Sequence, residues 1–234
     1  MKRSRFACLL LTAVCAVSLL CPAAWAAEVK ALSATVERTG GNVSLHYSMV
    51  EQGVEDSSRL SAEVRQQVKT TARRTSDSSV SISTADRAEA ESLLGIRLAS
   101  STAFDALQKG SENSENIVVA FRPSQKVDQT SYYQYRVDGE NRIELLADTR
   151  WDESFQRAET VWIAPGGASV SKATYTAQTG ETYQISSVKN AAGATVQQYV
   201  LFQNGGTVYT LIASGASLPQ NYLYSILDTM TFPA

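Results

Sequence analysis

Short strand-like segments, separated by turns that contain glycine, follow one another through the second half of this chain. Asp138-Gly139 stands between segments 132–137 and 142–147, and Asn204-Gly205 opens the turn between 196–202 and 208–213. Asp-Gly and Asn-Gly pairs supply the positive φ angles of tight hairpin turns. Further segments of this kind lie at 117–121, 159–164, 172–177 and 182–188. Strands at this spacing pair with their neighbours in sequence, so the pattern predicts an antiparallel meander.

Other segments have the features of helices. Leu60, Val64 and Val68 recur every four residues within 58–72, which gives a thin apolar stripe on a polar helix. Segment 83–94 is rich in alanine and is followed by Gly95, a common residue just beyond a helix end. We also expect a helical turn at 102–107 and a closing helix from Ser217, whose spacing to Gln220 matches a capping box. The chain is therefore predicted to be α+β, a curved antiparallel sheet meander with two or more helices packed on one face.

The chain divides into three parts by composition. Residues 1–26 form a targeting segment, 27–82 an N-terminal part, and 83–234 the domain of sheet and helices. The N-terminal part begins with a hairpin at 31–49 that turns at Gly40-Gly41. Its second half, 51–81, is polar and basic, and two interpretations stay open for it: a surface helix, or a linker.

Residues Met1–Ala26 have the pattern of a secretory signal peptide. Three basic residues precede a short apolar run, and Ala24-Trp25-Ala26 places small residues at the cleavage site. Cleavage after Ala26 would remove all three cysteines, and with them three of the 21 basic and none of the 23 acidic residues, so the net charge would change from −2 to −5. We expect a secreted or extracytoplasmic protein, free or held at the cell surface, without a membrane span after cleavage; the alternative is a retained anchor.

Several catalytic classes find little support in the sequence. His46 is the only histidine, and it lies between Leu45 and Tyr47 in a predicted strand, where a structural role is the simpler interpretation. With one histidine and no mature cysteine, we expect no metal site of these ligands and no cofactor. A calcium site with oxygen ligands stays open as an alternative, although no D-x-[DN]-x-[DN]-G loop occurs. No phosphate-binding loop, dinucleotide fingerprint or nucleophile-elbow motif occurs. The acidic balance also argues against nucleic acid as a partner.

Two weaker catalytic patterns remain as alternatives. Ser169–Lys172 and Ser186–Lys189 match the S-x-x-K of serine enzymes that act on peptidoglycan, although both fall in predicted strands. Asp148, Asp152 and Glu153 gather beside Trp151, as the carboxylates of a glycosidase do beside an aromatic residue. Because acidic residues also collect in ordinary solvated loops, we expect no catalytic residue in this chain.

Aromatic and basic residues give the best indication of a binding surface. The aromatic candidates are Tyr132, Tyr133, Tyr135 and Trp151. Strand alternation places Tyr133 and Tyr135 on one face of the sheet and Tyr132 on the other. Arg73 and Arg74 end the one basic stretch of the chain, in which Arg59, Arg65 and Lys69 also oppose a single acidic residue, Glu63. Cross-strand aromatic pairing and a solvated helix face are the alternatives.

Segment 80–234 resembles a domain of unknown function found in exported proteins of Gram-positive bacteria, often beside anti-sigma-type regulators. The resemblance lies in the helix that ends at 90–96, in the tyrosine-rich hairpins, and in 206–211 before the closing helix. The ending 226–232 is also similar to that of the PsbP-like family. The resemblance implies an extracytoplasmic, non-catalytic domain, and it assigns no functional residue.

These observations together predict a protein that binds a cell-envelope polymer or a protein partner and catalyses nothing. Two alternatives are kept: a hydrolase with an atypical carboxylate or serine site, and a carrier that holds an apolar ligand between its sheet and its helices.

Overall fold

A computed structural model describes residues 28–54, 56–111, 114–152, 155–163 and 169–233. The predicted signal segment Met1–Ala26, with its three cysteines, lies outside these residues. Within the described part of the chain, no helix combines the length and the apolar character needed to cross a membrane.

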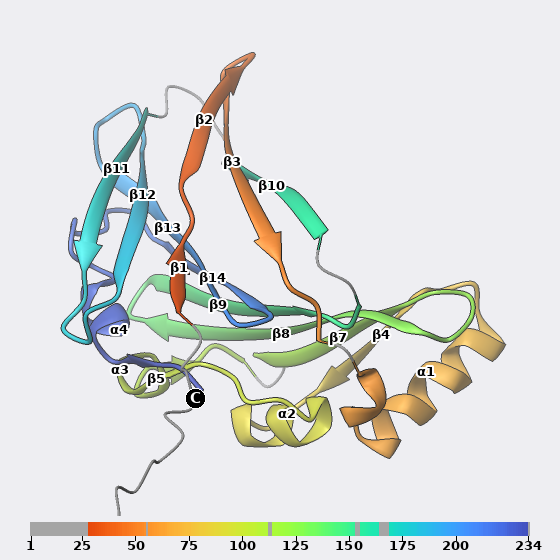
Figure 1. The fold of residues 1–234 in the computed structure, drawn as a ribbon. Coiled ribbons are helices and arrows are strands. Elements are labelled where there is room, and N and C mark those ends of the chain that lie inside the picture. The colour runs from red at the N-terminus through yellow and green to blue at the C-terminus, as the bar shows by residue number, and fades with distance from the viewer. Residues whose placement is uncertain (1–27, 55, 112–113, 153–154, 164–168, 234) are drawn as a thin grey trace, which may run out of the picture.

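A large antiparallel sheet forms the centre of the molecule (Figure 1). Its strand order is β11-β12-β13-β14-β9-β8-β7-β4, with β1 paired to β13 and β6 paired to β8. The strands are β1 (Val29–Ala31), β4 (Ser79–Ser83), β6 (Gln108–Lys109), β7 (Glu115–Phe121), β8 (Val127–Asp138), β9 (Asn141–Arg150), β11 (Ser169–Thr176), β12 (Thr182–Lys189), β13 (Thr195–Asn204) and β14 (Thr207–Ser214). Sequence neighbours pair through β7-β8-β9 and through β11-β12-β13-β14, which confirms the predicted antiparallel sheet.

A second, three-stranded sheet stands on one face of the large sheet. It consists of β2 (Ala34–Thr39), β3 (Asn42–Glu51) and β10 (Phe155–Ile163), in the order β10-β3-β2. The predicted hairpin at 31–49 is therefore present, with Gly40 and Gly41 at positive φ in its turn. The segment predicted as a meander strand at 159–164 instead belongs to β10, which leaves the large sheet and pairs with β3.

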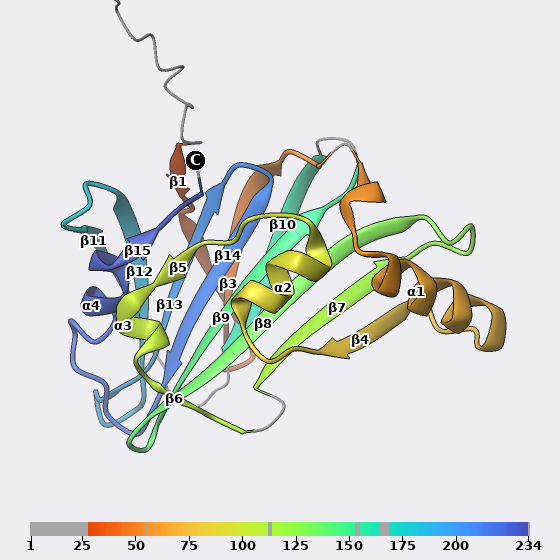
Figure 2. The same ribbon diagram turned by 90° about the horizontal axis from the view of Figure 1, so that it is seen from below.

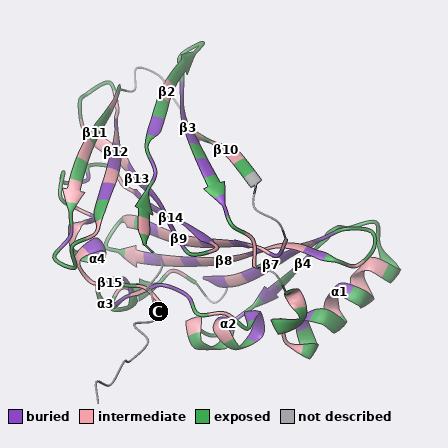
Figure 3. Ribbon diagram, in the orientation of Figure 1, coloured by how far each residue is buried: buried purple, intermediate pink, exposed green. Residues whose placement is uncertain are grey.

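Apolar side chains fill the space between the two sheets. Val43, Leu45 and Tyr47 of β3 pack with Tyr199 and Leu201 of β13 in one buried cluster. Figure 3 shows the corresponding purple bands on the facing strands. Because both faces of β13 and β14 are covered over much of their length, these strands are buried almost throughout.

Helices cover the opposite face of the large sheet (Figure 2). They are the short η1 (Ser57–Arg59), α1 (Ala62–Arg74), α2 (Arg87–Leu94), α3 (Thr102–Asp105) and α4 (Tyr224–Asp228). The two-residue strands β5 (Ser100–Ser101) and β15 (Met230–Thr231) pair beside α3 and α4. Side chains from the helices and the sheet form one continuous core, and this arrangement confirms helices packed on one sheet face.

Two predicted elements differ in extent from what is observed. In the segment 83–94, Ser83 still belongs to β4 and the helix begins only at Arg87, because Asp86 is the residue that caps α2. Gly95 ends that helix at φ 64°, as predicted. The closing helix is only the five-residue α4, because turns occupy most of the chain between Ser217 and Tyr224.

Candidate binding surface

Helix α1 forms for reasons that its sequence makes plain. Ser61 caps it by accepting a hydrogen bond from the N–H of Val64 at 3.3 Å, and Glu63 lies in the first turn, where the helix dipole favours a negative charge. Val64 and Val68 are buried in the core shared with the sheet. The helical interpretation of segment 58–72 is therefore confirmed, with its boundaries shifted to Ala62 and Arg74.

The solvent side of this helix carries positive charge. Arg65, Lys69 and Arg73 follow one another every four residues and so form one line along α1, with Arg59 before the helix and Arg74 at its end. We call these five residues the basic stripe. All five side chains are exposed, and Figure 3 shows the exposed outer side of α1 in green.

Among the described residues, the basic stripe makes no ion pairs, whereas eight of the other thirteen basic residues do. Eight other basic side chains pair with carboxylates: Arg87, Arg97, Lys109, Arg122, Arg136, Arg142, Arg150 and Arg157. Asp56 lies near the start of the stripe, and its pKa is lowered chiefly by hydrogen bonds from Ser58 and less by the charges of Arg59 and Arg65.

Helix stability accounts for part of this charge. Arg73 and Arg74 lie in the last turn, where positive charge is favourable to the helix dipole. Arg65 and Lys69 lie earlier, and like charges four residues apart repel by a few tenths of a kcal/mol, roughly 0.2–0.5. Repulsion within the line of three cations therefore lowers the stability of the isolated protein. Binding of an anionic partner would relieve this repulsion.

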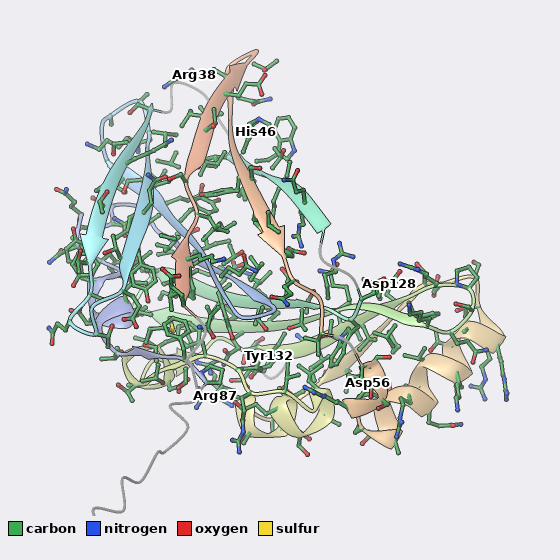
Figure 4. The ribbon with its side chains drawn as sticks, viewed as in Figure 1. Arg38, His46, Asp56, Arg87, Asp128 and Tyr132 are labelled. Atoms are coloured by element: carbon green, nitrogen blue, oxygen red, sulfur yellow. The ribbon has the colours of Figure 1, made fainter. Side chains whose placement is uncertain are left out.

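Tyr132 lies on the helix-covered side of the sheet, within an internal ionic cluster (Figure 4). Its hydroxyl donates to Glu115 Oε2 at 2.9 Å, and Arg136 Nη2 donates to Glu115 Oε1 at 2.5 Å. Lys109 Nζ lies 3.3 Å from the same carboxylate. Burial and the neighbouring Glu115 raise the pKa of the Tyr132 phenol. Tyr132 therefore belongs to the core and presents no binding surface.

Trp151 is also a core residue. It is 2% exposed, and its indole Nε1 donates to Thr130 Oγ1 at 3.0 Å. We had predicted that this ring would be available to a ligand, but it is buried.

Tyr133 and Tyr135 lie on the other face of the sheet, so the predicted alternation is present. Arg142 connects them: its Nη2 donates to the Tyr133 hydroxyl at 2.7 Å, and its guanidinium lies 4.3 Å from the centre of the Tyr135 ring. Arg142 also pairs with Glu144. The two tyrosines therefore share a structural partner within the sheet, which is an arginine of the neighbouring strand and not the aromatic side chain that the cross-strand alternative expected.

The carboxylates near Trp151 point to separate partners. Asp148 accepts hydrogen bonds from Ser131 and from Gln129, the latter at 3.1 Å. Asp152 pairs with Arg122 at 2.8 Å. Glu153 lies outside the described residues.

His46 lies on the outer face of the small sheet (Figure 4). Its Nε2 is 2.8 Å from Glu37 Oε2, and its Nδ1 is 3.1 Å from Thr160 Oγ1. The three side chains come from the adjacent strands β2, β3 and β10 and form one line across the surface of the sheet. The contacts are of the kind that a hydroxyl–imidazole–carboxylate triad makes, but they lie on an open sheet face.

Both S-x-x-K motifs lie in strands, as expected. Lys172 Nζ donates to the carbonyl of Ala34 in β2, so this ammonium is engaged with the main chain. Ser171, Ser187 and Lys189 line a hollow of about 280 Å³ beside Tyr224.

Sequence reasoning missed two exposed features. Trp162 is 68% exposed and Val50 is 58% exposed, both on the outer face of the small sheet. Strand β4 is the second, and it contacts α1 at the edge of the large sheet. The alternation Ser-Val-Ser-Ile-Ser was the available signal for β4.

Comparisons with known proteins add no assignment. No family model, no curated protein and no solved structure matches this chain. The resemblance to exported Gram-positive domains and to the PsbP-like family stays a prediction, and the function must be argued from the geometry above.

Proposed function

We propose that this chain is an extracytoplasmic, non-catalytic protein that binds an anionic component of the cell envelope through the basic stripe of α1. The signal-peptide pattern of Met1–Ala26 supports the location. The line of Arg65, Lys69 and Arg73, which no described carboxylate pairs with, is the observation that carries the binding function.

The lack of ion pairs in the basic stripe differs from the pairing of cations elsewhere in the described residues. Elsewhere in the described residues, eight arginines and lysines pair with carboxylates, even in the core at Glu115 and Arg136. Lys30, Arg38, Lys126, Lys172 and Lys189 make no ion pair there, but they are scattered and do not form a line on one helix. An excess of one charge on one helix of an acidic protein creates a local field that attracts anions and speeds their association. Contacts of this type weaken as salt is added, because exposed charges are screened.

The test compares charge reversal on the stripe with charge reversal elsewhere. The purified protein is titrated against fluorescent polyphosphate, poly-glutamate and vesicles of phosphatidylglycerol. We expect Arg65→Glu/Lys69→Glu/Arg73→Glu to weaken binding by about a hundredfold, since each cation near an anionic surface contributes roughly 1 kcal/mol.

Lys30→Glu/Arg38→Glu/Arg97→Glu is the matched control. These three residues are exposed and lie outside α1, and the triple change alters the net charge by the same amount. We expect binding by this control to stay within about twofold of wild type. Equal losses in both variants, or no binding of any probe by wild type, would contradict the proposal.

A hydrolase is the second candidate, and the Thr160–His46–Glu37 line is the observation that favours it. Activity on ester, amide and glycoside substrates that is abolished by both His46→Ala and Thr160→Ala would establish it. The carrier alternative has less support, because side chains from both layers fill the space between sheet and helices.

A further inference from the structure

Strand β4 ends the large sheet, and one side of its backbone faces away from every described strand. The N–H of Phe121 donates to the carbonyl of Ser78, and the N–H of Thr84 donates to the carbonyl of Glu115. Even-numbered residues of β4 therefore bond to β7, since hydrogen-bonding direction alternates along an antiparallel strand. Ser79, Ser81 and Ser83 consequently direct their N–H and C=O groups outward.

This edge lacks the charged residues, the proline and the bulge that commonly prevent strand pairing. Charged residues interrupt the other long edge strands: Lys172 in β11, Arg157 and Glu159 in β10, and Glu37 and Arg38 in β2. Strand β4 has the sequence Ser-Val-Ser-Ile-Ser, with no charge, no proline and no bulge in its pairing with β7. Such an edge is a template for another strand.

The neighbourhood of β4 favours a negatively charged occupant, since the five cations of the basic stripe outnumber Asp77, the one acidic residue of the turn before the strand. Helix α1 contacts β4, and only a short turn separates Arg74 from Ser79, where the strand begins. A second copy of this chain is disfavoured, because its β4 strand has the sequence Ser-Val-Ser-Ile-Ser and brings no negative charge to the basic stripe.

We propose that β4 accepts an extended acidic segment of a partner protein as an additional antiparallel strand. This inference rests on the proposed function and names the partner of the same basic surface. Main-chain hydrogen bonds to Ser79, Ser81 and Ser83 hold the segment, and the stripe attracts its carboxylates. In an antiparallel arrangement the C-terminal end of the segment lies beside Ser79, next to Arg73 and Arg74.

Two peptides of identical composition test this arrangement. Each contains a short run that alternates threonine with valine, and the glutamates follow the run in one peptide and precede it in the other. We expect the peptide with C-terminal glutamates to bind wild type about tenfold more tightly, because its carboxylates lie beside Arg73 and Arg74. Equal binding of the two peptides, or the reverse order, would overturn the arrangement.

Ser81→Pro tests the role of the backbone, with Ser81→Thr as its matched control. The N–H of Ser81 faces outward, so proline there leaves the pairing of β4 with β7 intact, as proline on an edge strand does. We expect Ser81→Pro to weaken peptide binding about tenfold, through the lost hydrogen bond and the steric bulk of the ring, and Ser81→Thr to leave it unchanged. Binding of polyphosphate should be the same in both variants.

Amide exchange of wild type supplies a readout that does not depend on a variant folding. The peptide should slow exchange at Ser79, Ser81 and Ser83, and polyphosphate should not. Unchanged exchange in β4 under saturating peptide, or an unchanged peptide affinity in Ser81→Pro, would overturn the inference. A wild-type dimer that Ser81→Pro makes monomeric would assign the edge to a second copy instead. Stripe-dependent binding of polyphosphate without peptide binding would leave the proposed function standing and defeat only this inference.

Discussion

The buried carboxylate of Glu115 shows how single residues of this protein depend on their partners. It is 2% exposed and is satisfied by Tyr132, Arg136 and Lys109 together. A buried ion pair adds little net stability, but removal of one partner leaves an uncompensated charge. The cluster therefore makes the folded state sensitive to each of its members.

Arg136→Met is expected to lower the free energy of unfolding by about 3 kcal/mol, because it leaves the buried Glu115 carboxylate without its arginine partner. Chemical denaturation measures the change. Arg97→Met is the control: Arg97 is 82% exposed in its pair with Glu91, so its loss should cost less than about 1 kcal/mol. The double variant Glu115→Gln/Arg136→Met should recover part of the loss; a larger loss in the double variant would contradict this account.

Glu51 should give the protein a specific pH dependence. Burial raises the pKa of its carboxyl, and Arg157 and Arg150 only partly oppose this effect. The folded state then holds the Glu51 proton more tightly than the unfolded state does. The stability of wild type relative to Glu51→Gln should therefore fall as the pH rises from about 4 through the raised pKa, and then level off.

Asp228 is the opposite case and serves as the control. Hydrogen bonds from Tyr175 and from Gln178 lower the pKa of its carboxyl. Its contribution is present above the ordinary pKa of about 3.9 and is lost as the pH falls through the lowered value. The stability of wild type relative to Asp228→Asn should thus rise with pH in the acid range, and equal slopes for the two comparisons would refute the assignments.

The sequence indicated which face each tyrosine occupies, but not what each one touches. The alternation of a strand separates Tyr132 from Tyr133 and Tyr135 without any knowledge of the fold. The partner of Tyr132 comes from β7, and the register of β7 against β8 decides that Glu115 lies within reach. That register depends on the packed sheet, so the ionic cluster could not be predicted from the chain alone.

Among the elements, the end of α2 is defined by one glycine. Gly95 adopts φ +64°, and a Cβ atom there would overlap the carbonyl of Arg59, just before α1. Gly95→Ala should cost about 3 kcal/mol from backbone strain and displacement of that segment. Gly139→Ala is the matched control: Gly139 has a similar φ of +60°, but a Cβ atom there would meet open space. This substitution should cost only about 1 kcal/mol of stability. Denaturation midpoints of the two variants measure these losses of stability. Similar losses in Gly95→Ala and Gly139→Ala would show that the contact with Arg59 is unimportant.

Some elements were predictable from local chemistry and others were not. The spacing of Leu60, Val64 and Val68 indicated a helix at α1, although a linker stayed open as the alternative for this polar segment. Strand β4 was missed because only Val80 and Ile82 mark it among serines. The closing helix was overestimated because the spacing of Ser217 and Gln220 imitates a cap, whereas the chain turns there to let Leu218 and Leu223 enter the core.

The whole molecule is an α+β sheet protein whose second sheet joins distant parts of the chain. Strand β10 pairs with β3 across more than a hundred residues, so that Ile163 faces Val43. No local sequence pattern predicts this pairing, because β3 and β10 would fit equally well in the meander. The result separates the molecule into a sheet-on-sheet end and a helix-covered end, and the basic stripe lies at the latter (Figure 1).

Sedimentation with envelope fragments of the producing cell tests the central claim most directly. Wild type, the stripe reversal Arg65→Glu/Lys69→Glu/Arg73→Glu and the control reversal Lys30→Glu/Arg38→Glu/Arg97→Glu are compared at several salt concentrations. The account predicts that wild type and the control sediment with the fragments at low salt, that added salt releases both, and that the stripe reversal stays in solution. Sedimentation of the stripe reversal at the wild-type level would contradict it.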